Sequence, residues 1–320
     1  MSTYRTIKGY NIKSVTSDPS NTKEGQIWYN DTSNKIRVNT IKPAAWASGG
    51  NLNTGRAGLG GAGIQTAALA FGGNTPSLNE TEEYNGSSWS EQNNLNTGRF
   101  YGGGFGSQTA AVMAGGIVQT AGTRNLNNSE EYNGTSWSEG NNLTTGRDIL
   151  SGAGTLTAGL CFGGFEPGNS GKTEEYDGTS WSEQNDLNTV VRGSSRAGIQ
   201  TSALSFGGDG PAPGIQVATE EYDGTSWTTG GNYPVAQEAG TGSSGPQTAA
   251  LGFGGYTTNT TNKYDGTSWT ATANMATARG GLGGDGTNDT SAIAFGGAPS
   301  RNITEEFLDL GNTVTSLDVS

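Results

Sequence analysis

The chain has 320 residues, 55 of them glycine, and a formal net charge of −12. It has no histidine and one cysteine, which excludes histidine-dependent catalysis, imidazole metal sites and an intrachain disulfide. No apolar run is long enough for a membrane-spanning helix, and the first residues have no apolar core, so we expect neither membrane insertion nor a secretory signal.

The first 34 residues are predicted to form a separate attachment segment. Residues 1–42 carry seven basic and three acidic side chains, whereas the rest of the chain is strongly acidic. Two alternating runs on either side of Asp31–Asn34 indicate a β-hairpin. The acidic remainder argues against nucleic acid as a partner, because binding phosphate needs basic surface.

A repeat with a period of about 45 residues fills the middle of the chain. A glycine pair after a short apolar run recurs at Gly72-Gly73, Gly115-Gly116, Gly163-Gly164, Gly207-Gly208, Gly254-Gly255 and Gly296-Gly297. Tryptophan recurs in step at Trp46, Trp89, Trp137, Trp181, Trp227 and Trp269. Two independent markers with one period predict a repeat architecture.

Each repeat is predicted to contain four short strands. In the first copy, one strand follows Asn51–Arg56, a second spans Thr66–Phe71 with alternating large and small residues, and a third is Thr81–Tyr84. Asn85-Gly86 favours a tight hairpin turn into a fourth strand that carries Trp89. Four strands per repeat of this length are typical of a β-propeller blade.

We therefore predict an all-β fold: a six-bladed β-propeller of four-stranded antiparallel blades over residues 35–320, with a short N-terminal β extension. The last repeat has no tryptophan after it. Residues near Lys35–Trp46 are expected to supply its outer strand, which would leave no open edge. The alternative is that Thr313–Val319 supplies that strand.

The order of arginine, glycine pair, Glu-Glu-Tyr, Asn-Gly or Asp-Gly and tryptophan resembles the kelch motif. The resemblance covers about residues 46–310 and implies a kelch-like propeller. A second resemblance is carried by Glu24–Asn30, which is similar to a stretch found in structural proteins of tailed bacteriophages, tail fibres above all. It implies a virion protein attached through residues 1–45 to other virion proteins, with Ile27, Trp28 and Tyr29 as candidate contacts.

Paired carboxylates and an arginine recur together in five repeats. Because the fifth repeat lacks both, we expect each arginine to form an ion pair with a glutamate of its own blade. A pair that recurs in this way is better explained by structure than by one active site. The predicted structural set is Arg56, Glu82, Glu83, Arg99, Glu130, Glu131, Arg147, Glu174, Glu175, Arg192, Glu220, Glu221, Arg279, Glu305 and Glu306. In the fifth repeat, Glu238 with Lys263 is the expected substitute.

The remaining chemistry-bearing residues indicate no cofactor and no metal. Cys161 falls on the small-residue face of a strand and is expected to be buried. Asp285–Asp289 has oxygen ligands at a spacing that resembles a calcium loop, but it lacks the later glutamate and favours an ordinary turn.

The connections between the second and third strands differ in length from repeat to repeat, so they are the candidate recognition loops. The longest are Ile117–Asn128, which contains Arg124, and Asp209–Ala218.

The sequence favours a non-enzymatic phage virion structural protein, such as a tail fibre or a capsid decoration protein. Its variable loops would bind a virion partner or a host-surface glycan or protein, and the sequence allows a homo-oligomer. The alternative is a carbohydrate-active enzyme of the polysaccharide lyase or glycosidase type. A cluster of non-repeated Tyr, Arg and carboxylate side chains in the central channel would favour that enzyme.

Overall fold

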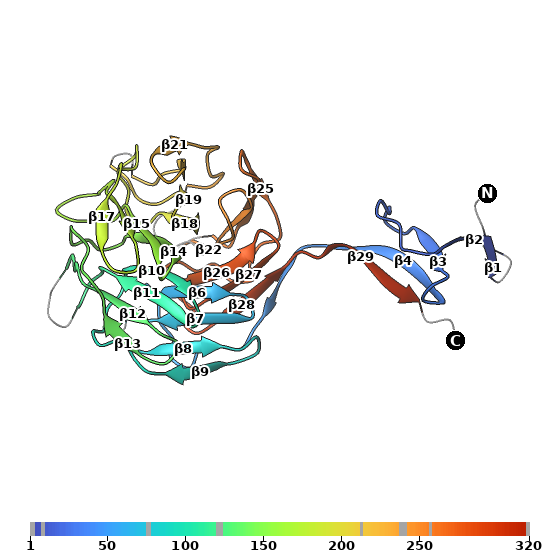
Figure 1. Ribbon diagram of the computed structural model, residues 1–320, viewed down its shortest axis with the longest axis horizontal. Helices are drawn as coiled ribbons and strands as arrows, with labels where there is room; N and C mark the ends of the chain where they lie inside the picture. The colour runs from blue at the N-terminus through green and yellow to red at the C-terminus, as the bar shows by residue number, and fades with distance from the viewer. Residues whose placement is uncertain are drawn as a thin grey trace. The chain divides into compact units, whose positions relative to one another are not determined.

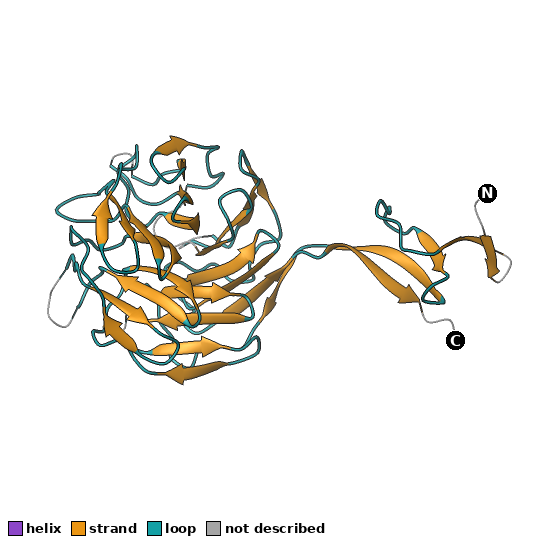
Figure 2. Cartoon of the chain, viewed as in Figure 1, coloured by secondary structure: helices purple, strands orange, loops and turns teal. Residues whose placement is uncertain are grey.

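The computed structural model describes residues 4–7, 10–74, 78–119, 124–211, 214–236, 242–255 and 258–317. Every regular element among them is a strand (Figure 2). The chain divides into two compact units: Met1–Ala45 with Leu308–Ser320, here the N-terminal unit, and Trp46–Phe307, here the repeat unit. This division differs from the expected boundary between residues 34 and 35.

The repeat unit holds six four-stranded antiparallel sheets in a propeller-like arrangement (Figure 1). The inner strands are β6 (Gly60–Ile64), β10 (Gly103–Ser107), β14 (Ser151–Thr155), β18 (Ser195–Ile199), β22 (Gly242–Ser244) and β26 (Gly283–Asn288). The second strands are β7 (Ala67–Phe71), β11 (Ala110–Ala114), β15 (Ala158–Phe162), β19 (Ser202–Phe206), β23 (Ala250–Phe253) and β27 (Ser291–Phe295). Each inner strand contacts the inner strand of the next sheet, and β26 contacts β6.

The third strands are β8 (Thr81–Tyr84), β12 (Ser129–Tyr132), β16 (Thr173–Tyr176), β20 (Thr219–Tyr222), β24 (Thr261–Tyr264) and β28 (Thr304–Leu308). The outer strands are β9 (Trp89–Gln92), β13 (Trp137–Glu139), β17 (Trp181–Glu183), β21 (Trp227–Thr229), β25 (Trp269–Ala271) and β5 (Ala45–Ser48). The last sheet has the order β26-β27-β28-β5, so the prediction that the strand near Trp46 completes it is confirmed.

A seventh sheet lies in the N-terminal unit, with the order β1-β2-β3-β4-β29. Its strands are β1 (Tyr4–Ile7), β2 (Tyr10–Val15), β3 (Ile27–Asn30), β4 (Lys35–Lys42) and β29 (Gly311–Leu317). The hairpin predicted around Asp31–Asn34 is present, because Ile27 pairs with Val38 and Asn30 pairs with Lys35. The other edge of β4 pairs with β29, so the rival strand near Thr313 belongs to this sheet instead.

The described residues therefore form seven sheets, so the predicted count of six is corrected: beside the six four-stranded sheets of the repeat unit, the expected short N-terminal β extension forms a five-stranded sheet of its own. The repeat markers did not reveal the seventh sheet, because neither β3–β4 nor β29 carries the glycine pair or the spaced tryptophan. The same pairing of β4 with β3 and β29 places the unit boundary after residue 45 rather than after residue 34.

The core of the repeat unit lies between neighbouring sheets rather than within one. One apolar cluster joins Leu69 and Phe71 of the first sheet to Met113, Tyr132 and Trp137 of the second. Phe71 and Trp137 have ring centroids 5.0 Å apart. Equivalent contacts join Phe162 to Trp227, Phe206 to Trp269, Phe295 to Trp89 and Phe253 to Trp46.

The third sheet meets the second through a different set of side chains. Ala114 stands where the other sheets have phenylalanine, and Phe105 of the inner strand packs against Trp181 instead, with centroids 6.3 Å apart. Gly159 makes room for this, since a Cβ there would lie 2.4 Å from the Phe105 ring. Ala114, Phe105 and Gly159 thus differ together from the equivalent residues of the other sheets, and the contact between the two sheets is kept.

A run of backbone hydrogen bonds also joins the sheets where each inner strand begins. The amide of Gly58 donates to Gly281 O (2.7 Å), Tyr101 to Gly58 O (2.8 Å), Ile149 to Tyr101 O (2.7 Å) and Gly193 to Ile149 O (2.7 Å). All five residues have positive φ, between 52° and 64°. Tyr101 and Ile149 take a conformation that favours glycine, and the inter-sheet bonds hold them in it.

Trp46 is expected to hold the last sheet together, because its ring contacts Phe253 (4.9 Å) and Phe307 (5.3 Å) and its Nε1 donates to Thr261 Oγ1 (3.0 Å). Trp46→Ala should lower the free energy of unfolding by about 3 kcal/mol, in the range for large aromatic truncations. Ser48→Ala, on the same strand but exposed, is the control. Denaturant titration of both variants checks this, and equal stabilities would contradict the assigned role of β5.

Candidate functional site: ion pairs, loop face and axial cavities

The expected arginine–glutamate pair is present in four of the five repeats that carry both residues. The N–O distances are 3.0 Å for Arg56–Glu82, 2.7 Å for Arg99–Glu130, 2.9 Å for Arg147–Glu174 and 3.0 Å for Arg279–Glu305. Burial lowers the pKa of Arg56, Arg99 and Arg279, while the paired carboxylates oppose that shift. The guanidinium stays charged because its pKa starts so high.

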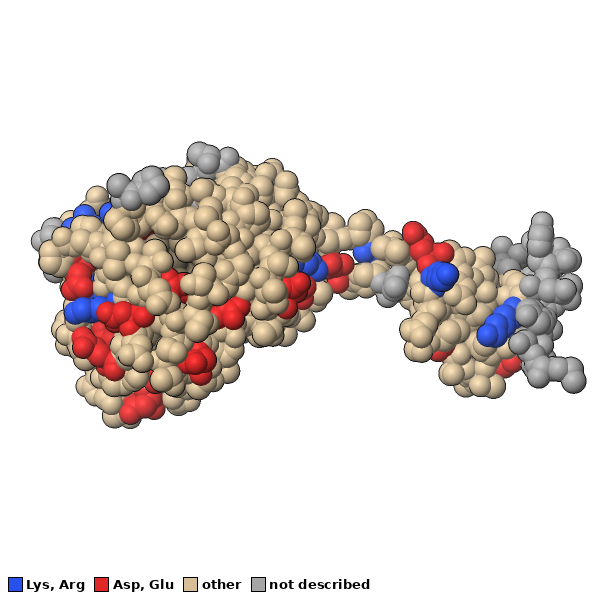
Figure 3. Space-filling view, turned by 90° about the horizontal axis from the view of Figure 1, so that it is seen from above, with Lys and Arg blue, Asp and Glu red and all other residues tan. Residues whose placement is uncertain are grey.

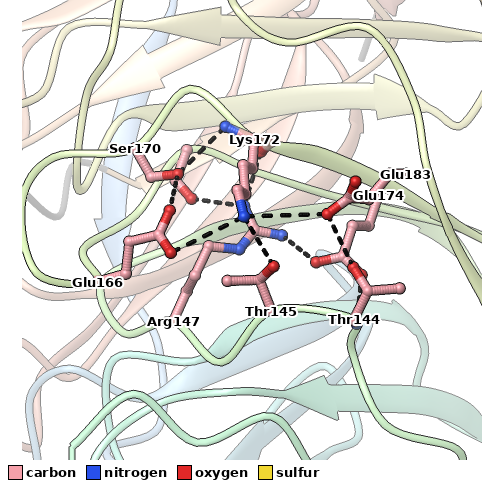
Figure 4. A network of polar contacts seen from close by, with 9 residues as sticks. Thr144, Thr145, Arg147, Glu166, Ser170, Lys172, Glu174 and Glu183 are labelled. Carbon is pink, nitrogen blue, oxygen red and sulfur yellow. Dashed lines mark hydrogen bonds and ion pairs between the residues drawn. The ribbon is translucent and has the colours of Figure 1, made fainter.

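Each pair ties three segments of its own sheet together, as Figure 4 shows for Arg147. Arg147 Nη1 donates to the carbonyls of Gly163 (2.7 Å) and Lys172 (2.6 Å). Glu174 accepts from the Thr144 amide (2.7 Å) and hydroxyl (2.8 Å). The pair thus joins the loop before the inner strand to the end of the second strand and to the third strand, which is a structural role.

Arg192 is a correction to this pattern, because it pairs with Asp209 (2.5 Å) rather than with Glu220 or Glu221. The segment from Asn188 to Arg192 is one residue longer than its counterparts. Val191 therefore occupies the arginine position, and its amide donates to Ser170 O as the Arg147 amide does to Leu126 O. Glu220 instead accepts from the amides of Asn188 and Thr189, both at 2.8 Å.

The fifth repeat replaces the ion pair with a neutral contact. Asn262 Nδ2 donates to the buried Tyr233 hydroxyl (3.2 Å), and these two residues occupy positions that elsewhere hold glutamate and leucine or methionine. Lys263 pairs with Asp289 at 3.4 Å. The expected alternative partner, Glu238, lies outside the described residues.

The second glutamate of each pair faces the neighbouring sheet. In five interfaces it accepts a hydrogen bond from a tyrosine hydroxyl: Tyr132 to Glu83, Tyr176 to Glu131, Tyr222 to Glu175, Tyr264 to Glu221 and Tyr84 to Glu306. Burial and the adjacent carboxylate raise the pKa of Tyr84 and Tyr132 to about 12. These tyrosines stay protonated and keep donating, so all the repeated carboxylates serve the framework.

Arg124 of one candidate recognition loop and Arg192, which pairs with Asp209 of the other, lie over one aromatic ring. The guanidinium carbons of Arg124 and Arg192 lie 5.5 and 5.4 Å from the centroid of Phe165. Arg124 Nε is 3.1 Å from Asp148 Oδ2, and half of the Arg124 side chain (53%) is exposed. With the Arg192–Asp209 pair, this cluster presents two cations and an aromatic ring on the loop face.

The other named loop residues belong to the framework. Ile117 is buried and forms a backbone bridge with Phe100. Asn128 accepts from Arg99 Nη1 through its carbonyl (2.9 Å), and Ala218 O accepts from the Gly207 amide (3.0 Å). Residues 120–123 and 212–213 of these loops lie outside the described part of the chain.

The three candidate attachment residues differ in exposure. Ile27 is exposed and Tyr29 is half-buried, whereas Trp28 is fully buried and donates Nε1 to Asp18 Oδ1 (2.8 Å). Trp28 is therefore a core residue of the N-terminal unit, so its expected role as a direct contact is corrected. The alternation of β3 turns its side chain to the opposite face from Ile27 and Tyr29.

Two cavities lie along the inner strands, and Arg196 lines both. The first is bounded by Tyr101, Ile149, Ser194 and the glycines that begin the inner strands. The second, of about 290 Å³, is bounded by Phe105, Arg196, Ser244 and Asp285 at the opposite ends of these strands. Burial raises the pKa of the Asp285 carboxyl to about 7, although the Arg196 charge opposes that rise.

Sequence reasoning missed this pair of charges, although a signal was present. Arg196 aligns with Gly61, Gly104 and Gly152 in the register of the inner strands. Asp285 was read as part of a turn, but it lies within β26 and accepts from the Gly286 amide (2.9 Å). A residue-by-residue alignment of the inner strands would have shown both as departures from the repeat.

Comparison with protein-family models gives no match, and a search of curated proteins finds no matching protein. Among the described residues, no cluster of three or more Asp, Glu or Cys side chains is suited to hold a metal ion. The described residues also contain no helix long and apolar enough to cross a bilayer. Cys161 is buried and free, and burial raises the pKa of its thiol to about 12.

Removing one arginine of a buried pair should cost far more stability than removing Arg192. Arg147→Ala leaves the Glu174 charge buried and unpaired, and we expect a loss of about 3–5 kcal/mol in the free energy of unfolding. Arg192→Ala breaks a partly exposed pair and should cost about 1 kcal/mol or less. Denaturant titration measures both, and similar losses for the two variants would refute the structural difference between them.

Asp285 should make stability depend on pH. Its pKa is near 7 when folded and near 3.8 otherwise, so between these values the folded chain holds a proton that the unfolded chain releases. The free energy of unfolding should fall as pH rises through this window and level off above it. Asp285→Asn should be more stable than the parent chain at pH 8 but not at pH 4.

A matched control for that titration is Asp177→Asn, because Asn85 and Asn133 occupy the same turn position in other repeats. Asp177 accepts backbone amides that lower its pKa, so this substitution should give no gain at pH 8. A gain at pH 8 in the control, or none in Asp285→Asn, would show that Asp285 is not the group responsible.

Proposed function

We propose that this chain is a non-enzymatic structural and adhesive protein of a tailed-phage virion. In this proposal the six four-stranded sheets are the blades of a kelch-like propeller, and the N-terminal unit attaches the chain to another virion protein. The observation that carries the proposal is that the repeated glutamates, and the four arginines that pair with them, serve the framework. Recognition then falls to the non-repeated loops and to the N-terminal unit.

The surface chemistry of the N-terminal unit supports its role in attachment. It holds Ile27, Ile41, Leu308, Leu310, Val314 and Leu317, six of the ten large apolar side chains found exposed among the described residues. Ile27 pairs with Val38, and Leu317 pairs with Ile36, so both side chains lie on one face of the five-stranded sheet. An exposed apolar face of this kind is typical of a protein–protein contact.

The loop face supports the second part of the proposal, which is binding to a host-surface glycan or protein. Arg124, Phe165 and Arg192 combine cationic, aromatic and hydrogen-bonding groups, which are enriched in recognition surfaces.

The repeat unit has 24 acidic and 10 basic residues, and acidic side chains dominate the face in Figure 3. Nucleic acid is therefore an unsuitable partner.

One observation favours the alternative of a carbohydrate-active enzyme. Tyr101 and Arg196 line the same cavity, and a polysaccharide lyase without histidine could use such residues. A glycosidase is less well supported, because it needs two carboxylates around the scissile bond. Only Asp285 supplies a carboxylate among the described residues that line either cavity.

The attachment role predicts which substitutions abolish incorporation into particles. A phage lacking the gene would be complemented with the parent chain or with Ile27→Asp, Leu317→Asp or Ile199→Asp. The first two substitutions should reduce the amount of this chain in purified particles at least tenfold, because each places a charge on the proposed contact surface. Ile199 is exposed in the repeat unit and serves as the control.

Immunoblots of the particles measure the outcome. Absence of the parent chain from particles would refute a virion role, whereas normal incorporation of both Asp variants would refute attachment through this face. Incubation of the purified chain with host polysaccharide tests the alternative. Release of unsaturated uronates that is lost in Tyr101→Phe would identify a lyase.

A further inference from the structure

The inner strands carry two charges that no other sheet repeats. Where Arg196 stands, the equivalent positions hold glycine or serine, and where Asp285 stands they hold alanine, phenylalanine or serine. Arg196 belongs to β18 and Asp285 to β26, so they come from sheets separated in the chain by one other. The framework described above uses neither charge in a repeated contact.

Both side chains line the cavity of about 290 Å³. Each also forms a hydrogen bond with the backbone of strand β6. Arg196 Nη2 donates to Gly61 O at 3.1 Å. Asp285 accepts from the backbone at Gly63 as well as from the Gly286 amide. Within the described part of the chain, neither group forms an ion pair within 4.0 Å, although each shifts the pKa of the other.

This arrangement leaves hydrogen-bonding capacity directed at the cavity. A guanidinium has five N–H donors, and a carboxylate has about four acceptor sites. Above the pKa of Asp285, which is about 7, opposite charges face one cavity and disfavour both an anion and a cation as ligand. They suit a neutral ligand in which donors and acceptors stand side by side, as in the adjacent hydroxyls of a sugar ring.

Hydrogen bonds fix the turns at this end of the inner strands. The turns that follow the inner strands hold glutamine side chains that bond to the preceding sheet. Gln108 Nε2 donates to Ala68 O (3.1 Å) and Tyr84 O (2.6 Å), and Gln200 Nε2 donates to Gly159 O and Tyr176 O, both at 3.0 Å. Ile199 and Thr287, at the cavity rim, are exposed. A preformed cavity near 300 Å³ fits a small ligand.

We propose that this cavity binds one sugar residue of a neutral glycan, with adjacent ring hydroxyls held between the Arg196 guanidinium and the Asp285 carboxyl group. The site lies at the turn end of the inner strands, whereas the variable loops lie at the other end. This proposal names the class of ligand for the proposed host-surface role. It rests on the proposed function only in taking a host-surface glycan as the source of the sugar. The single carboxylate supports binding rather than hydrolysis.

The experiment uses the full chain and saturation-transfer NMR with D-glucose, D-galactose, D-mannose and N-acetyl-D-glucosamine, each titrated separately. Sodium sulfate and sodium acetate are titrated in parallel and followed by the shift in melting temperature. We expect at least one sugar to saturate and neither anion to compete with it. Weak binding in the millimolar range is sufficient for a single residue of a multivalent glycan.

The repeat itself supplies the variants, because Arg196→Gly and Asp285→Ala install residues that other sheets have at the same positions. Each should fold, as judged by its far-UV spectrum, and each should weaken sugar binding at least tenfold. Asp177→Asn, in an exposed turn that lines neither cavity, should leave it unchanged. If Arg196→Gly fails to fold, Asp285→Ala and Asp285→Asn still provide the comparison.

Three outcomes would overturn the proposal: saturation by none of the four sugars, stronger binding of sulfate or acetate than of any sugar, or sugar binding unchanged by both cavity variants. The incorporation assay is independent of this test. A chain that enters particles but binds no sugar would refute the cavity proposal alone, and a chain that binds sugar but never enters particles would refute the virion role alone.

Discussion

Burial between neighbouring sheets is the constraint on which the repeat unit depends. A four-stranded sheet of this composition, rich in glycine and alanine, cannot bury its own faces, so each one uses its neighbour. The phenylalanine of a second strand lies against the tryptophan of the next sheet, as in Phe71 and Trp137, and a tyrosine hydroxyl reaches back to a glutamate, as in Tyr132 and Glu83. Losing one such interface exposes two sheets, which explains why the substitutions at Ala114, Phe105 and Gly159 occur together.

Much of the repeat unit could be predicted, because its residues act at short range and recur. The glycine pair, the turn before each tryptophan and the joint loss of arginine and glutamate in the fifth repeat pointed to four-stranded sheets and to buried ion pairs. The number of tryptophans favoured the strand around Trp46 over Thr313–Val319 as the outer strand of the last sheet. These inferences rest on aligning equivalent positions of the repeats, and they hold where the spacing between those positions is the same in each repeat.

The predictions that failed did so where a local departure changes the geometry. One additional residue before Arg192 moves Val191 into the arginine position, and no composition argument reveals such a shift. Trp28 resembles an exposed aromatic contact in the sequence, but the alternation of β3 buries it beside Asp18. The contact from Arg196 to Gly61 joins strands far apart in the chain, so only the folded arrangement brings the two axial charges to one cavity.

The two units share two covalent connections, at Ala45–Trp46 and at Phe307–Leu308. A tensile force between a fixed N-terminal unit and a tethered repeat unit is therefore divided between two polypeptide segments. Both segments lead into the same end of the β4–β29 ladder, where Lys42 pairs with Gly311. A force applied along the ladder from this end therefore pulls both strands in the same direction and does not slide one past the other.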